Sequence, residues 1–159
     1  MNHKKIIGNL HHIVLAVRDL EKAEEFFSKL FDIKFLHAGE FKEAGFKTIY
    51  GENNLEIISP TRPDSDVAKF ISKKGEGLYA VAFEVSDAGK ARAKAEEMGI
   101  RVVGDINPSD LSGDVQEGNF REIWLHPKDV FGVYLMLAQS NIDVSSQIAK
   151  QVGRERKEK

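Results

Sequence analysis

Residues 10–19 read LHHIVLAVRD, and residues 78–87, 68 positions further on, read LYAVAFEVSD and align with them without a gap. Both stretches are rich in β-branched and apolar residues, which is typical of a largely buried strand. Each ends in an aspartate, a preferred N-cap residue, and apolar residues at helical spacing follow it. The match predicts two copies of one strand–helix–strand unit, with a functional cleft where the copies meet.

The remaining elements agree with a repeat. The fold class that we predict is α+β, with two βαβββ modules in tandem that form an incomplete barrel around a cleft. One domain, 1–159, contains module one (about 9–60), a linker helix region (about 61–77), module two (about 78–138) and a C-terminal tail (139–159). The predicted strands are 10–17, 33–37, 46–50 and 55–59, then 78–85, 100–103, 120–125 and 133–138. Predicted helices follow Asp19 and Asp87, a short one covers 67–72, and 107–118 is a loop.

Composition excludes several kinds of protein. The chain has 159 residues, a net charge of −2 and no cysteine, which excludes disulfides, thiolate nucleophiles and cysteine-bound zinc. No apolar run approaches the ~20 residues of a membrane span, and Gly8 and Asn9 interrupt the first one. We therefore expect a cytoplasmic protein without nucleic-acid or membrane partners. The polar tail fits one helix at 142–152, with an end that frays.

Four positions carry the chemistry that the repeat predicts. His12 in module one is equivalent to Ala80 in module two, and Glu56 is equivalent to Met136. A buried histidine and a buried glutamate are unfavourable unless they bind each other or a metal. Two readings stay open at this point: a hydrogen-bonded His–Glu pair without metal, or a weak divalent metal site with His12 and Glu56 as ligands.

The other histidines are weaker candidates. In a regular strand, neighbouring side chains point to opposite faces, so His11 is expected to point away from His12. His37 ends a predicted strand at the cleft mouth or in solvent. His126 precedes Pro127 in a turn and is a candidate for contact with a ligand.

Several motifs resemble the vicinal oxygen chelate superfamily, which includes glyoxalase I, extradiol dioxygenases and fosfomycin-resistance proteins. Within it the chain is most similar to the methylmalonyl-CoA epimerases, over roughly residues 9–138. The carrying stretches are His12–Ile13 leading to 16–20, Glu43 with Gly45, 63–65 with 68–70, 75–78 leading into 82–85, and 125–128 with 132–133.

The resemblance implies a site that this chain keeps only in part. The family's first histidine ligand falls on His12, and the ligand of the fourth strand falls on Glu56. The other histidine and glutamate ligands fall on Ala80 and Met136, so both are missing. The implied cofactor is a divalent metal (cobalt, manganese, nickel or zinc), weakly bound or absent, because alanine and methionine are poor ligands for a hard ion.

The implied partners are a small carboxylate or acyl-CoA ligand and a second copy of the chain in a homodimer. The family's catalytic carboxylate falls on Thr48. Candidate catalytic residues are Glu56, Thr48 and Glu43, with Glu84 or His126 as further candidates to complete a rearranged site. Candidate substrate-binding residues are Thr48, Ala80, Met136 and His126. Lys128, Lys69 and Arg62 are candidates for contact with CoA phosphates.

Three functions follow from these residues. The first is an acyl-CoA epimerase or related isomerase with a rearranged site. The second is an enzyme of the same superfamily, such as a lyase or isomerase, with another small carboxylate or thioester substrate. The third is a binding protein without catalysis, in which Ala80 and Met136 would widen an apolar pocket. Fold class alone does not decide among them.

Overall fold

The computed structural model describes residues 5–110 and 119–158 of the chain. Its strands are β1 (Ile7–Ala16), β2 (Phe35–Phe41), β3 (Phe46–Gly51), β4 (Leu55–Pro60), β5 (Gly77–Val85), β6 (Val102–Ile106), β7 (Phe120–Leu125) and β8 (Tyr134–Ser140). Its α-helices are α1 (Leu20–Phe31), α2 (Asp66–Lys74), α3 (Ala88–Glu97) and α4 (Val144–Glu155). Two single 3-10 turns, η1 (Pro108–Asp110) and η2 (Pro127–Asp129), complete the set.

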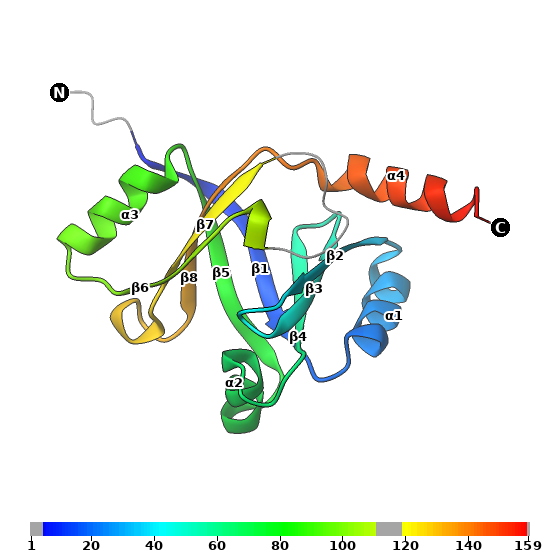
Figure 1. Ribbon diagram of the computed structural model, residues 1–159, viewed down its shortest axis with the longest axis horizontal. Coiled ribbons are helices and arrows are strands. Elements are labelled where there is room, and N and C mark those ends of the chain that lie inside the picture. The colour runs from blue at the N-terminus through cyan, green and yellow to red at the C-terminus, as the bar shows by residue number, and fades with distance from the viewer. Residues whose placement is uncertain (1–4, 111–118, 159) are drawn as a thin grey trace.

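The strands form one curled sheet in the order β2-β3-β4-β1-β5-β8-β7-β6 (Figure 1). Strand β1 is parallel to β4, and β5 is parallel to β8, so each module has the same internal order. The modules join through the antiparallel pair of β1 and β5. The predicted α+β fold with two βαβββ modules around an incomplete barrel is therefore confirmed.

A pseudo-twofold axis passes through the centre of this joining pair. Ile13 lies opposite Val81, and the repeat makes these two residues equivalent. His12 and Ala80, which are also equivalent, therefore lie on either side of the axis. The same holds further out, because Glu56 is paired with Val14 while Met136 is paired with Ala82. The sheet thus brings the four predicted site positions around one axis.

The two faces of the sheet form different cores. The outer face of module one packs Leu20 of α1 against Ile49 and Ile57, and the outer face of module two packs the alanines of α3 against Ile123. The concave face holds the largest cluster, which runs from Val14 and Ile58 across to Trp124, Met136 and Ala138. Helix α2 covers one end of it. Asp19 and Asp87 cap α1 and α3 by accepting backbone N–H bonds, as their sequence positions predicted, and Ser65 caps α2 in the same way.

The tail beyond β8 forms a longer helix than the sequence indicated. Helix α4 continues to Glu155 and packs against β2, where Ile148 is only 4% exposed. The backbone N–H of His37 in β2 donates to Oε1 of Gln151, 3.2 Å away. The tail therefore covers the edge strand of module one. The predicted fraying does not affect most of α4, which packs against the sheet.

Two further predictions differ from the structure in their limits. The strand expected at 100–103 is β6, which begins two residues later, and the backbone N–H of Arg101 donates to the side chain of Asp129 instead of to a strand. The loop expected at 107–118 begins with η1, and its remainder lies outside the described residues. None of the helices in the described ranges is long and apolar enough to cross a membrane.

Candidate functional site

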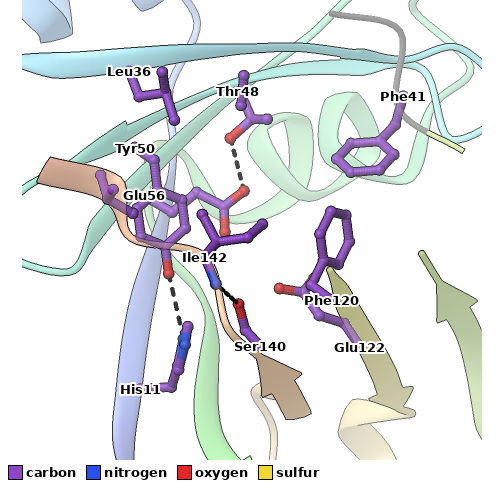
Figure 2. A pocket seen from close by; sticks show the side chains of 12 residues that line it. His11, Leu36, Phe41, Thr48, Tyr50, Glu56, Phe120, Glu122, Ser140 and Ile142 are labelled. Atoms are coloured by element: carbon purple, nitrogen blue, oxygen red, sulfur yellow. Dashed lines mark hydrogen bonds between the residues drawn. The ribbon is translucent and has the colours of Figure 1, made fainter. Parts of the chain in front are cut away.

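A pocket opens on the concave face, where module one meets the end of module two (Figure 2). The volume of its cavity is about 70 Å³, which suits a group of a few heavy atoms. Its walls are mostly apolar, with five polar or titratable side chains and a tyrosine. The lining residues are His11, Leu36, Ala38, Phe41, Thr48, Tyr50, Glu56, Phe120, Glu122, Ser140, Ile142 and Val144.

A buried ion pair lies at the wall of this pocket. Nε2 of His12 is 3.1 Å from Oε2 of Glu56, and His12 and Glu56 are only 1% and 7% exposed. The angle between these two groups is not that of a directed hydrogen bond, so Nε2 makes a close ionic contact and no hydrogen bond. Burial disfavours the charged imidazole, but the Glu56 carboxylate outweighs it and raises the pKa of His12. The structure thus brings together the two residues that the sequence singled out.

Thr48 completes the setting of Glu56. Its Oγ1 donates a 2.7 Å hydrogen bond to Oε1 of Glu56, and both residues face inward from the paired strands β3 and β4. The two oxygens of Glu56 are therefore held by different groups, His12 and Thr48. Because Thr48 has no carboxylate, its role in the structure is to orient Glu56.

His11 lies where the sequence analysis did not expect it. Between Leu10 and His12, β1 contains one residue more than the opposing segment of β5, so His11 forms a β-bulge. A bulge disturbs the alternation of side chains, and His11 therefore turns into the pocket beside His12. The two Nδ1 atoms are 2.6 Å apart. The expectation that His11 points away from His12 is wrong for this reason.

The pKa values of the two imidazoles are shifted in opposite directions. Burial and the neighbouring His12 lower the pKa of His11, whereas the pKa of His12 is raised. His12 therefore holds a proton more strongly than His11, which favours His12 as the donor and His11 as the acceptor between their Nδ1 atoms. A chain of contacts follows: His11, His12, the Glu56 carboxylate and the Thr48 hydroxyl.

Tyr50 supplies a hydroxyl to the same pocket. Its oxygen lies 3.5 Å from Nδ1 of His11, and Figure 2 shows the ring between Leu36 and Glu56. Burial, followed by the charges of Glu56 and Glu122, raises the pKa of Tyr50 far above its ordinary value. Tyr50 therefore keeps its proton at any physiological pH and can donate a hydrogen bond to a ligand oxygen.

Glu122 is a site residue that the sequence analysis missed. It lies on β7 and enters the pocket beside Phe120, on the side away from Thr48 and Tyr50 (Figure 2). Burial and the nearby Glu56 charge raise the pKa of Glu122 to about 7, against the opposite effects of His12 and Trp124. The signal was available: within the strand FREIWL, Phe120, Glu122 and Trp124 share one face, so the glutamate is a polar residue on an otherwise apolar face.

Four other candidates lie outside the pocket. Ala80 and Met136 are both 0% exposed within the concave core, so they do not widen the pocket as the sequence analysis expected. Trp124, which is paired with Met136 in the sheet, belongs to the same buried cluster. Glu43 is exposed in the turn between β2 and β3. His126 caps η2, where its Nδ1 accepts from the backbone of Lys128 at 3.1 Å.

The remaining charged candidates have other contacts. Glu84 accepts the backbone N–H of Asn9, and it is not among the residues that line the pocket. Arg62 donates to the carbonyl oxygens of Lys42 and Glu43, each at 2.7 Å, and so fastens the turn between β2 and β3. Lys69 lies with His126 on a separate, shallow hollow. His37 is on the outer surface, 2.8 Å from Glu24.

The residues present do not fit the metal that the resemblance implies. His12 and Glu56 contact each other, and the equivalent positions of module two, Ala80 and Met136, offer no hard ligand atom. Within residues 5–110 and 119–158, no group of three or more His, Cys, Asp or Glu side chains is placed to hold an ion. We therefore derive no chemical step through a metal.

Comparisons with known proteins show similarity to methylmalonyl-CoA epimerases. Human mitochondrial methylmalonyl-CoA epimerase is 31% identical over 140 residues, which cover 84% of this chain and 75% of the relative. An ethylmalonyl-CoA/methylmalonyl-CoA epimerase of Cereibacter sphaeroides is 29% identical, with 84% and 99% covered. A variant of Streptomyces coelicolor methylmalonyl-CoA epimerase, solved with 2-nitronate-propionyl-CoA, superposes with a TM-score of 0.72 at 28% identity, and 86% and 99% of the chains are covered.

A family model gives the assignment directly. The model described as Glyoxalase/Bleomycin resistance protein/Dioxygenase superfamily matches residues 11–120, which include the second half of β1, the rest of module one and module two as far as the start of β7. The match begins at the histidine bulge and ends at the first residue of β7, so it spans the repeat on which the fold is built. The chain belongs to the glyoxalase/bleomycin resistance protein/dioxygenase superfamily.

Proposed function

We propose that this protein is an epimerase-like isomerase that moves the α-proton of a small acyl-CoA or carboxylate ligand in the pocket between its modules. The observation that carries the proposal is the buried ion pair of His12 and Glu56 at a ligand-sized pocket. The similarity to methylmalonyl-CoA epimerases supports the substrate class. A solved relative that holds methylmalonyl-CoA supports it as well.

The pocket offers the groups that α-proton chemistry needs. Such a reaction requires a base near the α-carbon and a donor near the thioester oxygen, where negative charge develops. Glu56 is held by His12 and Thr48 and is the carboxylate placed to act as the base. Tyr50 keeps its proton and is the donor placed to bind the oxygen. The apolar walls exclude water, which strengthens both interactions.

The bound acyl group would enter the pocket while the rest of the CoA lies outside it. A space of about 70 Å³ is too small for a nucleotide but fits an acyl group of a few carbons. Ile142 and Val144, just before and at the start of α4, form part of the wall. The C-terminal segment therefore shapes the site, although it lies beyond the residues that match the family model.

The test is α-deuterium uptake from heavy water. The purified protein is incubated with methylmalonyl-CoA and with 2-methylbutyryl-CoA, once with a chelator and once with cobalt or manganese added. We expect uptake at the α-carbon of at least one thioester, well above the rate without protein. Binding of both thioesters without any exchange would favour the non-catalytic function, and neither binding nor exchange would reject the substrate class.

Two expectations from the resemblance accompany this proposal. Metal analysis of the purified protein is expected to show less than one tightly bound divalent ion per chain, because only His12 and Glu56 of the family's ligands remain. A tight, stoichiometric ion would contradict this. The homodimer stays a prediction, and light scattering of the full chain measures it directly.

A further inference from the structure

Glu122 occupies the position in module two that Thr48 occupies in module one. In module one, Thr48 is paired with Ile58, two residues beyond Glu56. In module two, Glu122 is paired with Ala138, two residues beyond Met136. Since Glu56 and Met136 are equivalent in the repeat, Thr48 and Glu122 are equivalent as well. The carboxylate that the resemblance placed at position 48 is thus present at the position related to it by the pseudo-twofold axis.

Both carboxylates of the pocket reach it from different modules. Glu56 comes from β4 of module one, and Glu122 comes from β7 of module two. Figure 2 shows Glu56 next to Thr48 and Tyr50, and Glu122 on the other side next to Phe120. A ligand between them has one carboxylate on each side, which is the arrangement that inversion at a carbon atom requires.

The charge of the pocket restricts what it can accept. Among the residues that the structure describes, the lining includes two glutamates and no lysine or arginine. The imidazole of His12 already contacts Glu56. A ligand that carries its own carboxylate at the α-carbon would be desolvated next to Glu122 with no free cation in this described lining to balance it. A neutral, apolar α-substituent would instead contact Leu36, Phe41 and Phe120.

We propose that Glu122 is the second proton-transferring carboxylate of this pocket, opposite Glu56, and that the pair selects acyl thioesters whose α-carbon carries no carboxylate. The proposal rests on the proposed function, because it assumes α-proton transfer in this pocket. It goes beyond that function by naming the second acid–base residue and by excluding malonyl-type thioesters as the preferred substrates.

Every proton in the proposed reaction is accounted for. One carboxylate takes the α-proton, and the electron pair of the C–H bond moves into the thioester to form an enolate. The other group, in its protonated form, returns a proton to the opposite face of the same carbon. Nothing is oxidised or reduced, and the substrate and product have the same atoms. The two carboxyl groups end with exchanged protonation states and reset by exchange with solvent.

The experiment follows inversion and exchange separately in heavy water. The full chain is incubated with each C2 epimer of 2-methylbutyryl-CoA and, in parallel, with methylmalonyl-CoA. The configuration at the α-carbon and its deuterium content are measured. We expect the wild-type protein to invert the neutral thioester, with kcat/KM at least about tenfold higher than for methylmalonyl-CoA. Faster turnover of methylmalonyl-CoA would overturn the selectivity but keep the proposed function. Exchange with neither thioester would remove the proposed function itself.

The variant Glu122→Gln separates a catalytic role from a structural one. With one carboxylate left, Glu56 can remove and return the proton on a single face. We therefore expect the rate of inversion to fall by about 10²-fold or more, while one C2 epimer still exchanges its α-hydrogen. Inversion at the wild-type rate would overturn the proposal. An equal loss of exchange for both epimers in a folded variant would overturn it as well.

Two further variants protect this conclusion. Glu122→Asp keeps the carboxylate but withdraws it by one methylene, so we expect inversion between that of wild type and that of Glu122→Gln. If Glu122→Gln does not fold, Glu122→Asp decides alone, because full inversion there with a changed side-chain reach would overturn the proposal. The matched control is Glu97→Gln on the exposed face of α3, which should leave both rates unchanged.

Discussion

The two halves of the concave face have the same backbone and opposite chemistry. In module one, His11, Glu56 and Tyr50 line the pocket, and His12 contacts Glu56. The equivalent positions in module two hold Tyr79, Ala80, Met136 and Trp124. Tyr79 even repeats the bulge of His11, because β5 has an extra residue there relative to β1. The difference lies wholly in side chains, which shows that this scaffold can keep a site in one half and fill the other.

The filled half is an aromatic core. The rings of Tyr79 and Tyr134 have centroids 4.9 Å apart, and Trp124 lies 5.9 Å from Tyr134. Phe70 meets Tyr79 edge to face at 5.1 Å. Packing of this kind stabilises the sheet, whereas the polar half leaves a space open for a ligand. The comparison therefore places the aromatic core in module two, while module one supplies most of the polar pocket, to which module two contributes Glu122.

The strongest way to break the comparison is to place a carboxylate in the filled half. Met136→Glu puts a charge at a position that is 0% exposed, next to Ala82 and Trp124. We expect a loss of at least about 4 kcal/mol in the free energy of unfolding, because the charge would be fully removed from water and would disturb the packing of the core. Denaturant titration measures it. Met136→Leu, which keeps the volume, should lose less than about 1.5 kcal/mol.

Removing the polar pair tests the other half. Glu56→Ala leaves His12 buried without its partner, and we expect about 3 kcal/mol of destabilisation together with loss of ligand binding. His12→Ala should weaken binding to a similar extent. His11→Ala should have a smaller effect, because His11 contacts Glu56 only through His12. Calorimetric binding of an acyl-CoA gives the order, and an effect of His11→Ala equal to that of His12→Ala would contradict it.

Helix α4, which packs on the edge strand β2, lies next to the pocket wall and extends the comparison to it. Ile148→Ala shortens a side chain of α4 that is only 4% exposed, and we expect about 2 kcal/mol of destabilisation. Since Ile142 and Val144 belong to the wall, acyl-CoA binding should weaken as well. Ser145→Ala, on the exposed side of the same helix, is the control. Unchanged binding in a destabilised Ile148→Ala variant would show that α4 is not needed for the pocket.

The outer edge of module two gives the smallest effect and a pH dependence. Hydrogen bonds from Arg121, then from Arg92, lower the pKa of Asp105 to about 2. A lowered pKa stabilises the fold above the pKa of the unfolded chain, and this stabilisation disappears as the pH falls toward about 2.

Asp105→Asn tests this charge network. Because Asp105 is partly exposed, we expect it to cost only about 1–2 kcal/mol at pH 7. The difference between wild type and variant should shrink steadily from pH 5 to pH 3, measured by denaturant titration at each pH. A difference that stays constant over this range would show that the ion pairs of Asp105 do not account for it.

Much of this molecule could be predicted from its sequence, for physical reasons. The repeat of residues 10–19 at 78–87 implied the pseudo-twofold axis, and alternation placed His12 and Glu56 on the concave face. The helix caps were predictable because Asp and Ser side chains accept backbone N–H bonds at fixed spacing. These features depend on local pattern, and the structure reproduces them.

The rest depends on contacts between distant segments. The bulge at His11 arises from the register between β1 and β5, which no local pattern reports. Glu122 was overlooked because the repeat was compared by ligand positions, while its equivalence to Thr48 follows from strand pairing. Ala80 and Met136 were expected at a pocket surface, yet aromatic side chains from other strands cover them. The packing of α4 on β2 likewise brings together two segments that are far apart in the sequence.

The bulge in β1 also changes how this strand tolerates insertions and deletions. Leu10 is paired with Phe83 and His12 with Ala82, so His11 is an extra residue at this point of the ladder. Deleting it would restore regular pairing, keep His12 on its face and remove one imidazole from the pocket. In a regular strand the same deletion would exchange the two faces of everything before it. A single-codon change can therefore add or remove a pocket side chain here without rebuilding the sheet.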